Sequence, residues 1–179
     1  VCEYIEQLIL YPGASQVLDF ADGRVRLVGA RADRDGLLVG QRIATLKEHI
    51  PNSEARIAAI YRKGKSIVPN GDTVIQEGDE VFFIADRKDI RVFMSEIRRL
   101  EDPVRRVVIA GGGNIGVRLA LALEQTNQVK IIERDQSRAR VISEQLNKAI
   151  VLVGDAADEE LLLEENIDNV DVFCALTNS

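Results

Sequence analysis

The feature that most constrains this chain is a run of three glycines between an apolar segment and an amphipathic one. Residues 107–110 are all apolar, and Gly111, Gly112 and Gly113 separate them from a segment with the apolar spacing of a helix. Gly116 completes the pattern Gly-x-Gly-x-x-Gly. Between a strand and a helix, this pattern allows a tight turn, close approach of an anion to backbone N–H groups, and close helix–strand packing. It therefore predicts a strand–turn–helix unit that binds a phosphate-containing ligand.

A second strand supplies the acidic residue that a dinucleotide fingerprint requires. Residues 129, 131 and 132 are apolar and Glu133 follows them, about twenty residues after the glycines, as the fingerprint demands. A carboxylate there accepts hydrogen bonds from ribose hydroxyls and repels a 2′-phosphate, which favours NAD or an adenosine nucleotide over NADP. Arg134 weakens that preference slightly. The alternative interpretation is a glycine turn that only connects a strand to a helix.

Other candidate contacts lie where later strands end. Asp155 and Ala156 follow the predicted strand 150–153, and Thr177 follows the predicted strand 170–176. The carboxyl ends of parallel strands line the ligand crevice of an open α/β sheet. Asp155 has a second interpretation as the N-cap of the next helix. The candidate nucleotide-binding residues are Gly111, Gly113, Asn114, Ile115, Gly116, Glu133, Arg134, Asp155, Ala156 and Thr177.

The two halves of the chain differ in their patterning. Residues 103–179 alternate strands with helices, which indicates a parallel sheet with right-handed crossovers. Residues 24–86 carry short strands separated by glycine turns, which is typical of an antiparallel or mixed sheet with few helices. Residues 38–48 fit a short helix, and residues 88–100 fit an amphipathic one. The sequence thus predicts an α/β chain: a partial Rossmann-like, doubly wound parallel sheet preceded by a small α+β module.

Composition narrows the function further. The formal charge is −6 and the pI is about 5.0, which disfavours binding to nucleic acid. His49 is the only histidine, and Cys2 and Cys174 lie far from it in the sequence, so we predict no metal site and no catalytic residues. We expect Cys174 to be a small buried hydrophobe. No apolar stretch approaches the roughly 20 residues that a membrane-spanning helix needs.

The two segments together resemble the RCK family of domains, which regulate potassium conductance. Residues 104–179 resemble the nucleotide-binding RCK-N or TrkA-N domain through the glycine loop, Glu133, Gly154-Asp155-Ala156 and Ala175-Leu176-Thr177. Residues 24–86 resemble the companion RCK-C or TrkA-C module. That similarity is carried by Val39-Gly40-Gln41, Ile57-Ala58-Ala59-Ile60-Tyr61-Arg62, Ile67-x-Pro69-x-Gly71-Asp72-Thr73 and Glu77-Gly78-Asp79-Glu80-Val81.

The order of these segments carries its own implication. In the family the nucleotide domain normally precedes its C-terminal module, whereas here the module comes first. The resemblance therefore implies a tandem protein: residues 1–23 as the end of a preceding RCK-N domain, 24–102 as an RCK-C module with its trailing helix, and 103–179 as the start of a second RCK-N domain. The chain also opens on Val1 rather than methionine, so we expect it to be a window on a longer polypeptide.

The resemblance implies a regulatory subunit rather than an enzyme. Such a subunit is cytoplasmic and peripheral on the inner face of the cell membrane. It assembles as a homo-oligomeric ring beneath a TrkH- or TrkG-like potassium-translocating subunit. Its ligand would be NAD(H), with ATP and ADP left open, because some relatives carry an arginine where this chain has Asn114. We expect Arg118 and Arg138 to be solvated surface residues rather than substitutes for that arginine.

Two other functions use the same observations. The first alternative is an NAD-dependent oxidoreductase, which predicts a substrate domain with an acid–base histidine or lysine. The second is a purely structural module with a degenerate site, which predicts that the substitution Gly113→Asp has no functional effect.

Overall fold

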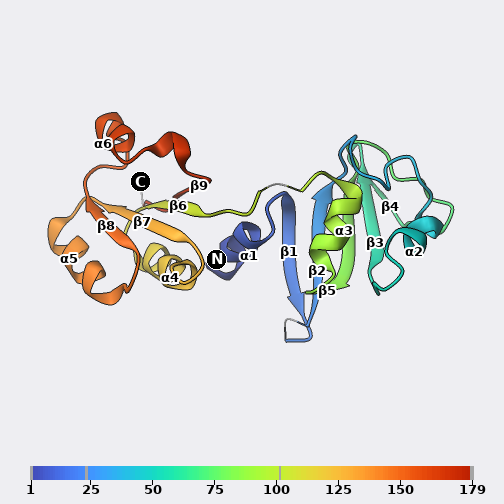
Figure 1. Ribbon diagram of the computed structural model, residues 1–179, viewed down its shortest axis with the longest axis horizontal. Coiled ribbons are helices and arrows are strands. Elements are labelled where there is room, and N and C mark those ends of the chain that lie inside the picture. Colours follow the sequence, from blue (N-terminus) through green and yellow to red (C-terminus); the bar gives the residue numbers. More distant parts are fainter. Residues whose placement is uncertain (1, 23, 101, 178–179) are drawn as a thin grey trace. The chain divides into compact units, whose positions relative to one another are not determined.

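The computed structural model of the chain describes residues 2–22, 24–100 and 102–177, which form two compact units. The first unit combines residues 2–10 with residues 103–177. The second unit consists of residues 11–22, 24–100 and 102. Each unit has a sheet and a core of its own (Figure 1).

The first unit is built on a four-stranded parallel sheet in the order β8–β7–β6–β9 (Figure 1). Its strands are β6 (Arg106–Ala110), β7 (Gln128–Glu133), β8 (Ile150–Val153) and β9 (Val172–Ala175). The chain adds β7 and β8 on one side of β6 and then crosses to place β9 on the other side. Because ligands bind where the strand order reverses, the crevice of this sheet lies at the carboxyl end of β6. The predicted doubly wound parallel sheet is confirmed.

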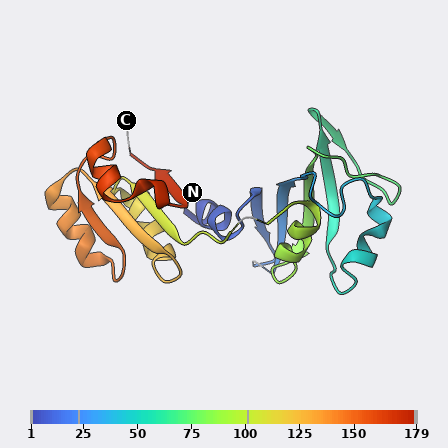
Figure 2. The ribbon, with the colours of Figure 1, turned by 45° about the horizontal axis from the view of Figure 1, so that its top comes forward.

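Helices cover both faces of this sheet (Figures 1 and 2). On one face, α4 and α5 bury Leu119, Leu123 and Ile142 against Ile109 and Ile131 of the central strands. Helix α1 packs against α4, and α6 with the following 3₁₀ turn η2 lies on the other face. Their bounds are α1 Cys2–Leu10, α4 Asn114–Leu123, α5 Gln136–Gln145, α6 Glu159–Glu164 and η2 Ile167–Asn169.

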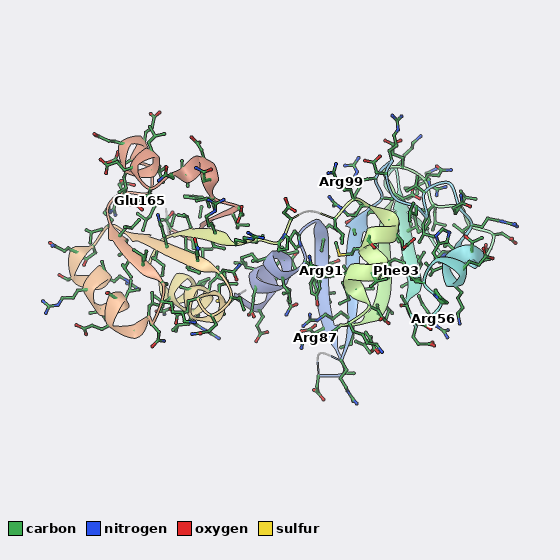
Figure 3. The ribbon with its side chains drawn as sticks, in the orientation of Figure 1. Arg56, Arg87, Arg91, Phe93, Arg99 and Glu165 are labelled. Atoms are coloured by element: carbon green, nitrogen blue, oxygen red, sulfur yellow. The ribbon has the colours of Figure 1, made fainter. Side chains whose placement is uncertain are left out.

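The second unit is a five-stranded antiparallel sheet in the order β1–β2–β5–β3–β4. Helix α3 packs on one face, where Phe83 of β5 and Phe93 of α3 stack with ring centroids 4.0 Å apart. Arg91, on the same helix, is exposed (Figure 3). The bounds are β1 Ala14–Phe20, β2 Val25–Arg31, η1 Ile43–Thr45, α2 Leu46–His49, β3 Arg56–Arg62, β4 Lys65–Ile67, β5 Glu80–Asp86 and α3 Ile90–Ile97.

The structure divides the segment that the sequence assigns to one preceding domain. Helix α1 belongs to the first unit, where Ile9 joins the core between α4 and the sheet. Strand β1 belongs to the second unit and pairs antiparallel with β2. Residues 1–23 are therefore not a single structural piece among the residues described, although their derivation from a preceding nucleotide domain stays a prediction. Val1 and Gly23 lie outside the described residues.

The helix predicted over residues 38–48 is shorter than its apolar spacing suggests. Val39 forms an isolated bridge with Ile75, and the Gly40 N–H donates to the Ile75 carbonyl at 2.7 Å. These bonds hold the segment in a turn, in which the Gln41 N–H also donates to the Leu38 carbonyl at 3.0 Å. Gly40 takes a φ of +84° that favours glycine. Helical structure begins only at Ile43. Pairing with a distant segment thus overrides a local helical pattern.

Glu124 is a buried carboxylate at the end of α4. It accepts hydrogen bonds from the backbone N–H groups of Asn147 (3.0 Å), Lys148 (2.8 Å) and Ala149 (3.0 Å). These bonds, that from Lys148 foremost, lower the pKa of Glu124 from 4.5 to about 2. The carboxylate therefore ties the end of α4 to the segment that enters β8.

We predict that Glu124→Gln destabilises the first unit by about 1–3 kcal/mol at pH 7, because the new amide NH₂ faces backbone donors. A carboxylate whose folded pKa is depressed stabilises above its unfolded pKa, and the effect is lost as pH falls through the folded value. The difference between wild type and variant should therefore shrink between pH 4.5 and about 2. Urea unfolding measures it, with Glu144→Gln at an exposed site of α5 as the control. An equal difference at pH 7 and pH 2 would contradict this account.

Candidate nucleotide-binding site

The glycine loop begins with a residue that no larger side chain can replace without strain. Gly111 follows β6 with a φ of +107°, a conformation that L side chains rarely adopt. Its N–H donates to the carbonyl of Ile132 at 2.9 Å. A Cβ at this position would lie 2.9 Å from the carbonyl oxygen of Leu176, at the end of β9. Gly111 is therefore fixed both by its backbone conformation and by the approach of the neighbouring strand end.

The first turn of α4 is pressed against this loop. Gly116 is buried, and a Cβ there would lie 2.1 Å from the carbonyl oxygen of Gly111. The helix can occupy this position only because residue 116 has no side chain. The close packing predicted for the third glycine of the pattern is present.

Gly113 occupies the open side of the same loop. It is the N-cap residue of α4, with an extended backbone, and no described side chain caps the helix. The first N–H groups of an α-helix lack intrahelical partners and carry the positive end of the helix dipole. A Cβ on Gly113 would meet no atom within 4 Å, and Asn114 and Ile115 are exposed beside it. The loop thus presents free backbone donors to an open space of the kind that binds phosphate.

Glu133 lies against the glycine loop, as its place at the end of β7 predicts. One carboxylate oxygen accepts the N–H of Gly112 at 2.9 Å, and the other accepts the N–H of Asp135 at 2.9 Å. The side chain is 14% exposed. A carboxylate offers about four acceptor positions, so these two bonds leave Glu133 able to accept from a ligand hydroxyl.

The prediction that Arg138 is only a solvated surface residue is wrong. Although its side chain is 51% exposed, its Nε–H donates to the carbonyl of Gly112 at 2.9 Å. The same Nε lies 3.9 Å from a carboxylate oxygen of Glu133. The signal for this contact is the position of Arg138 in the first turn of α5, three residues after the N-cap Asp135. Arg118, by contrast, is exposed on α4.

The remaining predicted residues lie along the same edge of the sheet. Thr177 is exposed after β9, and its backbone N lies 3.1 Å from the position of a Cβ on Gly111. Arg134 is exposed after β7, and Asp155 and Ala156 follow β8. The Gly154 N–H donates to the Glu133 carbonyl at 3.1 Å, which joins the β8 loop to the site.

Asp155 is not the N-cap of α6, so that interpretation of the residue is wrong. Its side chain accepts the N–H of Ala157 at 2.9 Å, within the loop. The cap is Asp158, whose side chain accepts the N–H of Glu160 at 3.0 Å. Asp155 is exposed at the carboxyl end of β8, the edge on which the candidate site lies.

The site carries hydrogen-bonding groups suited to an anion and a sugar. Within residues 2–22, 24–100 and 102–177, there is no group of three or more His, Cys, Asp or Glu side chains able to hold a metal ion. Burial raises the pKa of the Cys174 thiol on β9, which keeps it protonated.

No helix formed by the described residues has the length and apolar character needed to span a membrane.

Comparison with known proteins agrees with this description. Residues 27–98 match the TrkA-C domain and residues 107–179 match the TrkA-N domain. Over 178 residues the chain is 56% identical to the Trk system potassium uptake protein TrkA of Vibrio alginolyticus and 54% identical to that of Halomonas elongata. Each match covers 99% of this chain and 39% of the relative.

Solved structures show the same fold. The GsuK RCK domain superposes with a TM-score of 0.58 at 17% identity, covering 99% of this chain and 38% of that one. The GsuK channel bound to NAD gives a TM-score of 0.55 at 18% identity, covering 96% of this chain and 30% of that one.

The chain has the fold of an RCK domain, and it contains a TrkA-C domain followed along the chain by a TrkA-N domain. Over nearly its whole length it is similar to the Trk system potassium uptake proteins TrkA. It spans 39% of the length of the curated relatives named above. The resemblance seen in its motifs is confirmed.

We predict opposite effects on stability from substitutions at the two ends of the loop. Gly116→Ala should lower the free energy of unfolding by about 1–3 kcal/mol, because its Cβ overlaps the Gly111 carbonyl. Gly113→Asp should keep or raise it, because Asp is a favoured N-cap and its charge suits the helix dipole. Urea unfolding monitored by circular dichroism measures both. A loss for Gly113→Asp as large as that for Gly116→Ala would show that the loop is not open as described.

Proposed function

We propose that the chain is the nucleotide-binding part of a cytoplasmic regulatory subunit that controls potassium uptake. The single observation that carries this proposal is the open start of α4, where no side chain of the described residues caps the helix and a Cβ on Gly113 would meet no atom within 4 Å. The names of the relatives, all Trk potassium uptake proteins, supply the biological setting.

The ligand we propose is an adenosine nucleotide, NAD(H) in the first instance, with ATP and ADP as the alternatives. The pyrophosphate would bind the N–H groups of Gly113, Asn114 and Ile115, on the open side of the loop at Gly113. Glu133 would accept hydrogen bonds from ribose hydroxyls. Arg134, Asp155, Ala156 and Thr177 would line the rim of the same crevice.

The GsuK channel that shares this fold was solved bound to NAD, which supports NAD(H) as the first ligand to test. Asn114 carries no charge, so it gives no terminal phosphate a preferred partner. The choice among the three nucleotides therefore depends on measured affinities.

A nucleotide controls ion flux only if it binds two conformations with different affinities. The helix that would bind the phosphates also contacts α1, since Ile5 and Ile9 pack into the core beside α4. Helix α1 continues along the chain into β1 of the second unit. We propose that a shift of α4 on ligand binding is passed to α1 through this contact.

The proposed partner is a TrkH- or TrkG-like potassium-translocating subunit, with this protein peripheral on the inner face of the membrane as a homo-oligomeric ring. We propose no enzymatic activity and no nucleic-acid partner. A net charge of −6 disfavours contact with a phosphate backbone. The names of the relatives favour this regulatory role over the oxidoreductase alternative.

We predict that Gly113→Asp weakens NADH binding by about tenfold or more. Two like charges about 4 Å apart repel by about 1 kcal/mol in water and about 4 kcal/mol near a protein surface. Gly113→Asn is the matched control, because it has nearly the same shape and also caps helices well but carries no charge. Isothermal titration of NADH, ATP and ADP onto the intact protein measures the effect.

The expected order of affinity is wild type, then Gly113→Asn, then Gly113→Asp. Absence of binding by all three nucleotides to wild type would overturn the proposed function. Equal affinity in wild type and Gly113→Asp would place the nucleotide elsewhere and support the purely structural alternative.

A further inference from the structure

We propose that Arg138 is a positioning residue of the nucleotide site. Together with Glu133 it forms hydrogen bonds to the backbone of Gly112, and we call this pair of side chains the clamp. The role we assign is to hold the glycine loop in its ligand-binding geometry before the ligand arrives. The ligand part of this inference rests on the proposed nucleotide function, whereas the clamp itself is a property of the folded loop.

The two side chains of the clamp form hydrogen bonds to both backbone polar groups of Gly112. Glu133 accepts the Gly112 N–H at 2.9 Å, and the Arg138 Nε–H donates to the Gly112 carbonyl at 2.9 Å. Asp135 holds the Glu133 side chain and the backbone of Arg138. Its N–H donates to the Glu133 carboxylate at 2.9 Å, and its own carboxylate accepts the backbone N–H of Arg138 at 2.7 Å. The turn between β7 and α5 therefore presents an acceptor and a donor to the loop at fixed positions.

Because peptides are planar, these two hydrogen bonds also fix the direction of the Gly113 N–H, one of the proposed phosphate-binding groups. In a planar trans peptide the carbonyl and the following N–H point in opposite directions, and no described peptide is cis. With the Gly112 carbonyl turned toward Arg138, the Gly113 N–H points away from α5. With the Gly112 N–H turned toward Glu133, the Gly111 carbonyl points toward Gly116, where the structure places it.

The loop needs such a clamp because its own residues restrain it weakly. Three consecutive glycines have the largest conformational freedom of any tripeptide, and this freedom is lost on ordering. Rotation of the 112–113 peptide would exchange the Gly113 N–H for a carbonyl oxygen, which repels an anion. A side chain at 112 cannot supply the restraint, since a Cβ there would lie 2.3 Å from Ile142 and 2.7 Å from Glu133. Hydrogen bonds from other residues to the loop backbone are therefore the remaining way to restrain it.

Arg138 could instead act through its charge on a bound phosphate, and the two roles predict different variants. Met has a similar length but carries neither the charge nor an N–H donor. Lys keeps the charge but lacks the planar guanidinium that places Nε–H at the carbonyl. Arg140 is the matched control, because it lies on the same helix, is exposed and pairs with Glu144. A positioning role predicts that Arg138→Met and Arg138→Lys behave alike.

The test combines nucleotide affinity with amide hydrogen exchange in the intact protein. We expect Arg138→Met and Arg138→Lys each to weaken NADH binding by about three- to tenfold, the range for loss of one hydrogen bond. In the ligand-free protein, both should speed exchange of the Gly112 N–H, while amides of β6 keep their protection. Arg140→Met should change neither quantity, and all variants should keep the wild-type circular dichroism.

Several results would overturn the proposal. Wild-type exchange at Gly112 in both Arg138 variants would show that no clamp exists. Wild-type affinity in Arg138→Lys, together with weakened binding in Arg138→Met, would assign Arg138 a charge contact with the ligand instead. If wild type binds no nucleotide, the proposed function fails, but faster Gly112 exchange in the variants would still establish the clamp.

Discussion

The close approach of α4 to the glycine loop is the contact on which the rest of the candidate site depends. A single added methyl group at Gly116 would overlap the Gly111 carbonyl, with only 2.1 Å between them. This packing aims the start of the helix at the carboxyl edge of the sheet, where the strand order reverses. The uncapped N–H groups beside Gly113 therefore face the crevice in which open α/β sheets bind ligands.

The loop is restrained from its other side by the turn after β7. Glu133 accepts the N–H of Gly112, and Arg138 donates to its carbonyl. The glycine segment is therefore restrained by hydrogen bonds rather than by side-chain packing. The same carboxylate has acceptor capacity left for a ribose. In the proposed complex, ordering of the loop and recognition of the sugar would be linked through this one side chain, and preorganisation of this kind raises affinity by reducing the entropy lost on binding.

Much of this arrangement follows from local sequence patterns. Apolar strands alternating with amphipathic helices predict the parallel sheet, and the glycine spacing predicts a tight turn at Gly111 and close packing at Gly116. The positive φ of Gly111 and the contact between Gly116 and Gly111 are local, because both arise within one strand–turn–helix unit. That is why the order and position of these elements could be predicted from the sequence.

What could not be predicted depends on contacts between distant segments. The non-helical backbone at Val39 and Gly40 arises from pairing with Ile75, which outweighs a helical apolar spacing. The role of Arg138 arises from a backbone carbonyl on another element, and a surface arginine has no sequence pattern that reports such a partner. Asp155 and Asp158 are both plausible caps by residue type, and only the observed hydrogen bonds select Asp158.

The central claim is that a nucleotide binds at the glycine loop with its phosphates on the start of α4 and its ribose at Glu133. A structure of the intact protein determined with NADH tests this most directly. The account predicts the pyrophosphate within hydrogen-bond distance of the Gly113, Asn114 and Ile115 N–H groups, and a ribose hydroxyl on the Glu133 carboxylate. Nucleotide density elsewhere in the chain, with the space beside Gly113 filled by solvent alone, would contradict it.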